Sequence, residues 1–128
     1  MRTPEEFEPA IQSAVADGAN AFIVISDPVF FLNRNALYAL SEKYRIPVMY
    51  ENENSVEDGG LISYGTVLSE NFYRSAWYVD RLLKGEEAAE LPVQEPRTYV
   101  LTLNLSAARA IDLDIPKSVR DRADRVIE

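Results

Sequence analysis

The sequence predicts an α/β fold, a three-layer sandwich around a mainly parallel sheet. Segments with apolar residues at helical spacing alternate along the chain with short, continuously apolar runs. Such runs, which lack polar alternation, are typical of parallel strands that helices cover on both faces. The 128 residues contain no internal repeat and no linker that would divide them, and this length suits one domain. We therefore expect a single α/β domain over residues 1–128.

Periodicity and turn residues set the bounds of the expected elements. Helices are expected where apolar side chains recur every three or four residues, and strands where short apolar runs end at Pro or Gly. In chain order we expect a helix at 3–17, a strand buried on both faces at 21–25, a helix at 33–45, a strand at 47–50, a polar loop at 51–60, a strand at 61–64 that Gly65 ends, a helix at 69–84, an exposed connection at 86–97, a strand at 99–105, a short helix at 106–111 and a terminal helix from 116 towards 127.

Single residues support several of these bounds. Thr3 and Glu6 suit the cap and first turn of the first helix, and Gly18 suits its end. Pro9 lacks an N–H donor, so we expect a kink or a separate first turn there. Asn33 is placed to cap the second helix.

The composition is that of a globular protein and excludes several classes of function. Hydrophobic residues make up 47% of the chain and charged residues 27%, and the net charge is −8. Because this charge repels phosphate, we expect no nucleic-acid partner. The chain has no Cys and no His, which excludes thiol and His-based catalysis and most zinc sites. It has no apolar run of the ~18–20 residues that span a bilayer.

Candidate ligand contacts lie where the expected strands end. In an open α/β sheet, ligands bind beyond the carboxyl ends of the strands, and hydroxyl, carboxylate and aromatic groups fix small polar ligands. The candidates are Ser26, Asp27, Tyr50, Glu51, Ser63 and Tyr64. A structural interpretation competes with this one: Asp27 caps a helix, Tyr50 packs half-buried, and residues 63–65 form a turn.

Other chemistry finds little support in the sequence. No phosphate-binding Gly loop or nucleophile elbow occurs, and a Ser triad needs His. The acidic residues Glu51, Glu53, Glu57 and Asp58 lack EF-hand spacing, which favours a solvated acidic loop over a cation site. No two carboxylates are tied to one cleft, as a glycosidase requires. We expect no enzymatic activity, no metal and no cofactor.

Six segments of the chain form a familiar set. They are residues 18–28 (GANAFIVISDP), 45–50 (RIPVMY), 59–65 (GGLISYG), 78–85 (YVDRLLKG), 91–96 (LPVQEP) and 104–105 (NL). In this order and spacing they resemble the C-terminal part of the ABC-transporter substrate-binding proteins of the tryptophan/tyrosine-uptake type, which have the type I periplasmic-binding-protein fold. Asp112 departs from the pattern, because the family commonly has Gly there. This departure alters a turn and should not affect binding.

The resemblance implies a role in solute binding. Family members trap a small ligand between two α/β lobes and present it to a membrane permease. This chain would be part of the second lobe, and residues 61–85 would pack on a first lobe that it lacks. The ligand implied is amino-acid-like or an aromatic carboxylate, bound without chemistry. The resemblance also implies a periplasmic location, although residues 1–6 lack the apolar region of a signal peptide, so a complete chain would be cytoplasmic.

Two other functions are alternatives to solute binding. A stand-alone cytoplasmic domain, sensory or structural, could remain after loss of the first lobe and of transport. A phosphoacceptor receiver domain needs an acidic pair after its first strand and a Lys after a late strand, and neither is placed correctly here.

The helix expected at 69–84 has an unusually wide apolar face. Its apolar stripe is Phe72, Ala76, Val79 and Leu83, widened by Tyr73, Trp77 and Tyr78. Such a band is more often core or interface than a ligand contact, and a soluble monomer rarely exposes it. We therefore expect the chain to form a homo-oligomer through the 69–84 helix.

Overall fold

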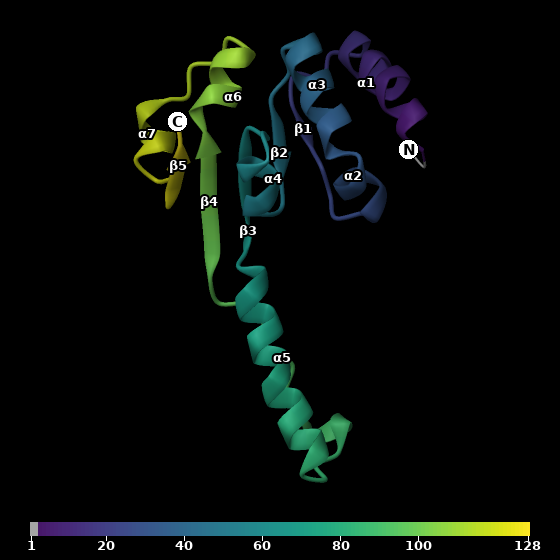
Figure 1. The fold of residues 1–128 in the computed structure, drawn as a ribbon, viewed down its shortest axis with the longest axis vertical. Coiled ribbons are helices and arrows are strands. Elements are labelled where there is room, and N and C mark those ends of the chain that lie inside the picture. Colours follow the sequence, from purple (N-terminus) through teal and green to yellow (C-terminus); the bar gives the residue numbers. More distant parts are fainter. Residues whose placement is uncertain (1–2) are drawn as a thin grey trace.

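The computed structural model describes residues 3–128 and confirms the α/β fold (Figure 1). Five strands form one sheet in the order β1-β2-β3-β4-β5. All neighbouring strands run parallel except β3 and β4, which are antiparallel. The elements are η1 (Pro4–Glu6), α1 (Phe7–Ala16), β1 (Phe22–Ile23), α2 (Pro28–Leu32), α3 (Arg34–Tyr44), β2 (Val48–Tyr50), α4 (Glu53–Glu57), β3 (Ile62–Thr66), α5 (Leu68–Leu83), η2 (Ala88–Glu90), β4 (Tyr99–Asn104), α6 (Leu105–Ala110), α7 (Lys117–Arg120) and β5 (Arg125–Ile127).

The first helix ends where the sequence predicts, but α1 begins only at Phe7. The separate first turn expected from Pro9 is present as the 3-10 turn η1, and α1 follows it directly. Thr3 occupies the cap position of η1, although its side chain makes no capping bond. Gly18 follows α1 with a φ of 93°, the left-handed conformation that Gly adopts without steric penalty.

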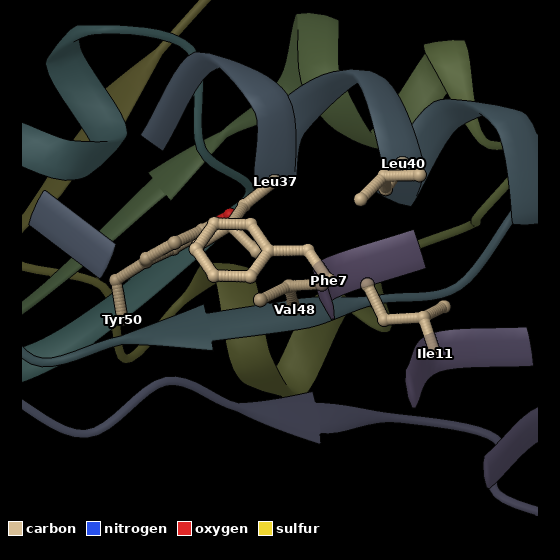
Figure 2. Packing of buried hydrophobic residues seen from close by; sticks show 6 residues of the cluster. All are labelled: Phe7, Ile11, Leu37, Leu40, Val48 and Tyr50. Carbon is tan, nitrogen blue, oxygen red and sulfur yellow. The ribbon is translucent and has the colours of Figure 1, made fainter. Parts of the chain in front are cut away.

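Two buried clusters hold the sheet to its helices. Figure 2 shows the first, where side chains of α1 and α3 pack against β2: Phe7, Ile11, Leu37, Leu40, Val48 and Tyr50. The second lies between β3, β4 and the chain that follows β4: Leu61, Leu103, Ala108, Ile111 and Ile115. The two clusters lie on opposite faces of the sheet. Met49 pairs with Ile62 and Ile62 pairs with Leu103, so these three side chains share one face. Val48 precedes Met49 and therefore points to the other face.

The prediction that the first strand is buried on both faces is wrong. Ile23 and Ile25 are 74% and 71% exposed, whereas Phe22 and Val24 pack against the first cluster. The cause is that one face of β1 has no covering layer in the described part of the chain. Over residues 3–128, helices cover only the Phe22 face of β1.

Three further predictions need correction. The polar loop expected at 51–60 contains the helix α4, which forms because Val56 is fully buried on its inner side. Gly65 does not end the third strand, since β3 continues to Thr66. The terminal helix expected from 116 is instead α7 followed by β5, which pairs with β4. The helix α2 was not among the expected elements, although the structural interpretation of Asp27 as a helix cap implies a helix start there.

The helix α5 extends away from the rest of the fold (Figure 1). None of its residues is buried. The segment that follows it covers one side, where the hydroxyl of Tyr78 donates to the carbonyl of Pro92 and Arg74 donates to Gln94 and to the carbonyl of Glu95. The other side carries the exposed residues Phe72, Val79 and Leu83. Over the described residues, no helix is long and apolar enough to cross a membrane.

Candidate functional site

A cavity of about 400 Å³ lies beyond the carboxyl ends of β1 and β2. Its walls come from the chain that follows each of these strands, from α2, and from the starts of α3, α4 and α5. This is the position that open α/β sheets use for ligands. The lining residues are Val24, Ile25, Ser26, Asp27, Pro28, Phe30, Phe31, Leu32, Arg34, Tyr50, Glu51, Asn52, Asn54, Ser55 and Leu68.

Four of the six predicted contacts line this cavity together. Ser26 and Asp27 come from the end of β1, and Tyr50 and Glu51 from the end of β2. The parallel pairing of the two strands places their ends side by side. The geometry therefore brings these four residues to one site, as the argument from strand ends predicts.

Ser63 and Tyr64 lie outside the cavity because they sit within β3 rather than at its end. Ser63 is 1% exposed. Tyr64 stacks on Tyr99 of the neighbouring strand, with ring centroids 5.7 Å apart and planes 24° apart. The turn considered for residues 63–65 is absent, since all three belong to the strand.

Asp27 has a structural role at the cavity wall. Its Oδ1 accepts a hydrogen bond from the backbone N–H of Val29 at 2.7 Å, which caps α2. The structural interpretation of this residue therefore holds, and its second carboxylate oxygen has no partner among residues 3–128. One Asp side chain can cap a helix with one oxygen and contact a ligand with the other.

Tyr50 is buried rather than half-buried. It is 4% exposed and contacts Tyr38 edge-on, with centroids 5.6 Å apart. Burial raises the pKa of the Tyr50 phenol well above its usual value, and the nearby Tyr38 adds to this effect. Tyr50 therefore lines the cavity as a largely buried, neutral side chain.

Three buried hydroxyls lie in one row across the sheet. Tyr50 pairs in register with Ser63, and Ser63 pairs with Thr102, so all three side chains share a face. Over the described residues, none of these hydroxyls has a hydrogen-bond partner. Because an unpaired buried polar group costs free energy, the burial of these three hydroxyls beneath α4 lowers the stability of the fold.

Sequence reasoning missed four polar residues of the cavity, Arg34, Asn52, Asn54 and Ser55. Asn52 caps α4, with its Oδ1 accepting from the backbone N–H of Ser55 at 3.0 Å. Asn is one of the preferred N-cap residues, so Asn52 is a local signal for a helix start. Arg34 begins α3 and lines the cavity. No local signal marks Arg34, because its position depends on how α2 turns the chain.

The acidic residues near the site are paired or exposed rather than grouped. Asp58 Oδ2 lies 2.8 Å from Arg34 Nε, and Glu53 and Glu57 both contact Arg125. Over residues 3–128, no group of three acidic side chains could hold a metal ion.

A second cavity, of about 360 Å³, lies between α1 and β1. Its lining is apolar, with Ile23 and Ile25 on the strand side and Ala10 and Ala14 on the helix side. It offers no polar side chain to orient a ligand. The cavity at the strand ends is therefore the better candidate site.

Comparison with known proteins supports this reading of the fold. The model of the family described as ABC transporter substrate binding protein matches residues 2–127. No curated protein matches the chain.

Three solved structures have a similar fold. An ABC domain from Streptococcus pneumonia in complex with L-Trp is 21% identical, with a TM-score of 0.83 over 99% of this chain and 43% of that one. A conserved domain protein from Vibrio cholerae is 24% identical, with a TM-score of 0.85 over 97% and 42%. The ligand-free, open structure of a substrate-binding protein with adhesive properties from Clostridium difficile is 19% identical, with a TM-score of 0.69 over 100% and 42%.

The resemblance drawn from the sequence segments is thereby confirmed. The chain spans less than half the length of these three solved chains. Because the family model matches nearly all of its residues, the chain belongs to the family of ABC transporter substrate-binding proteins.

Proposed function

We propose that this chain forms part of a solute-binding protein and holds a small ligand in the cavity at the ends of β1 and β2. The observation that carries the proposal is the meeting of Ser26, Asp27, Tyr50 and Glu51 in one cavity of about 400 Å³ at the position where α/β sheets bind ligands. Family membership supports the same role.

The ligand we propose is amino-acid-like or an aromatic carboxylate. Phe30 and Phe31 give the cavity aromatic surface, and Asp27 and Glu51 give it carboxylates that suit an ammonium group. A protein of similar fold, from Streptococcus pneumonia, is in complex with L-Trp. Binding would involve no covalent chemistry, and an ABC permease would receive the ligand.

Residues 61–85 have a separate role in this proposal. The side of α5 that the following segment does not cover carries Phe72, Val79 and Leu83, which are 70%, 55% and 83% exposed. We propose that the first lobe of the family fold packs on this side, and that without it the chain forms a homo-oligomer through α5. Sedimentation velocity at tens of micromolar should show a dimer or larger species. Val79→Glu should dissociate it, and a wild-type monomer would contradict the proposal.

The binding proposal is tested by thermal unfolding with amino acids and aromatic carboxylates. A ligand at a hundredfold excess over its dissociation constant raises the free energy of unfolding by about 2.7 kcal/mol. We expect L-tryptophan or a related compound to stabilise the chain in proportion to the logarithm of its concentration. The same stabilisation by every compound, or by none, would contradict the proposal.

A further inference from the structure

Arg34 is the one basic residue among the described residues that line the cavity. Its guanidinium is fixed from two directions. Nε donates to Oδ2 of Asp58 at 2.8 Å, and Nη1 donates to the backbone carbonyl of Phe31 at 3.0 Å. The guanidinium carbon also lies 4.8 Å from the centroid of the Phe31 ring. The cavity wall therefore holds a guanidinium group, paired with Asp58, whose orientation is set before any ligand arrives.

This anchoring leaves the outer edge of the guanidinium available. An Arg side chain has five N–H donors, and the bonds to Asp58 and Phe31 use one at Nε and one at Nη1. Nη2 has no partner among residues 3–128, and the Arg34 side chain is 30% exposed. The planar fork formed by Nη1 and Nη2 matches the two oxygens of a carboxylate.

The negative groups of the cavity come from other elements. Asp27 follows β1 and Glu51 follows β2, whereas Arg34 begins α3. A ligand with an ammonium and a carboxylate can satisfy both signs at once. An amine that lacks the carboxylate would remove Arg34 from water without giving it a hydrogen-bond partner. Such an amine should therefore bind with lower affinity than the amino acid.

We infer that Arg34 is a specificity-determining residue that binds the carboxylate of the ligand, and that Asp58 is its positioning residue. The inference rests on the proposed function and narrows it. The ligand class becomes aromatic compounds that bear a carboxylate, with α-amino acids favoured by the carboxylates of the opposite sign. The corresponding amines should bind more weakly than the carboxylates.

The test compares three compounds that share an indole ring. L-tryptophan has both charged groups, indole-3-propionate has only the carboxylate, and tryptamine has only the ammonium. NMR titrations of the 128-residue chain give a dissociation constant for each compound. We expect Arg34→Gln to weaken the two carboxylates by roughly 10- to 100-fold, the range of one charged hydrogen-bonded pairing, and to leave tryptamine unchanged.

Matched variants separate a binding role from a structural one. Arg45 is also paired with an Asp, at 2.8 Å, but lies outside the cavity, so Arg45→Gln should change none of the three constants. Arg34→Lys keeps the charge without the fork and should weaken the carboxylates less than Arg34→Gln does. Asp58→Asn should weaken the carboxylates selectively and shift the NMR signal of the Arg34 Nε–H group.

The outcomes distinguish this inference from the proposed function. Saturable binding of L-tryptophan by the wild type, combined with equal losses for all three compounds in Arg34→Gln, would overturn the role of Arg34 alone. Unchanged carboxylate affinity in Arg34→Gln would do the same. Absence of saturable binding of any of the three by the wild type would overturn the proposed function, and the inference with it.

Discussion

Gly65 of β3 lies against the backbone of Glu51, at the edge of the cavity. A Cβ atom added to Gly65 would lie 1.6 Å from the carbonyl oxygen of Glu51 and 2.8 Å from its carbonyl carbon. Both contacts are with backbone atoms, so no side-chain rotation could relieve them. The chain that follows β2 can come this close to β3 only because residue 65 has no side chain.

Gly65→Ala should therefore displace the chain around Glu51. We expect the free energy of unfolding to fall by about 1–3 kcal/mol, as overpacking commonly causes, and ligand affinity to fall with it. Urea unfolding and the titration with L-tryptophan measure the two effects. Gly18→Ala is the control, because its Cβ would meet no atom within 4 Å. That variant should lose stability through its positive φ and keep its affinity.

The two roles of Asp27 are separable by substitution. Asn keeps an oxygen that can accept from the Val29 N–H, so Asp27→Asn should retain the helix cap and nearly all of the stability. It loses the negative charge, so it should bind L-tryptophan at least roughly tenfold more weakly. Asp27→Ala should lose both the affinity and about 1 kcal/mol of stability. Equal affinity in Asp27→Asn and wild type would leave Asp27 as a helix cap alone.

The buried hydroxyl of Tyr50 predicts a dependence of stability on alkaline pH. Because burial raises its pKa in the folded state, Tyr50 stays neutral in the folded chain when unfolded Tyr ionises. Its contribution is therefore fully present below pH ~10, the usual Tyr pKa, and is lost as the pH rises above that value. Tyr50→Phe should flatten this alkaline loss. It should not lower stability at pH 7, since the hydroxyl has no partner among residues 3–128.

Chemical unfolding of wild type and Tyr50→Phe between neutral pH and pH 11 measures this difference. Tyr64→Phe serves as the control that removes an exposed Tyr hydroxyl instead of a buried one, because Tyr64 is 53% exposed. A Tyr50→Phe variant that is markedly less stable than the wild type at pH 7 would show that the hydroxyl has a partner.

Much of the fold follows from local patterns, whereas its long-range pairings do not. The bounds of α3, β2 and α5 lie within one residue of the sequence prediction at each end, since Pro47 and Gly85 interrupt the chain close to them. The strand β5 was not predicted because it forms by pairing with β4, which lies far from it in the sequence. The backbone N–H of Leu101 donates to Asp124 Oδ2 at 2.8 Å, and no pattern within 116–127 records that contact.

The same contrast between local patterns and long-range contacts applies to the candidate site. Residues at the ends of β1 and β2 could be named because apolar runs visibly stop there. Ser63 and Tyr64 lie outside the cavity because β3 continues past Gly65. The sequence does not show that Gly65 is instead the point where the backbone of Glu51 comes close to β3. Arg34 could not be named, because its approach to the cavity depends on the turn through α2 and on its bond with Asp58.

Arg45 and Asp112 share an unusual backbone conformation and a salt bridge. Their φ angles are 48° and 55°, in the left-handed region, and their side chains pair at 2.8 Å on the surface. Asp112→Gly should relieve backbone strain and lose only an exposed ion pair, which contributes about 0–1 kcal/mol. Asp112→Ala should lose the pair and keep the strain.

Urea unfolding should therefore rank Asp112→Gly as more stable than Asp112→Ala by about 1 kcal/mol. Both variants should bind L-tryptophan as the wild type does, because Asp112 lies outside the cavity. Equal stability of the two variants would show that residue 112 is not strained.

The central claim is that the ligand lies where β1 and β2 end. The most direct measurement is an NMR titration of the isotope-labelled chain with L-tryptophan, read residue by residue. The account predicts saturable shifts at Ser26, Asp27, Glu51 and Arg34, with little change in the apolar cavity between α1 and β1. Saturable shifts at Ala10, Ala14 and Ile23 instead, or no saturable shift at all, would contradict it.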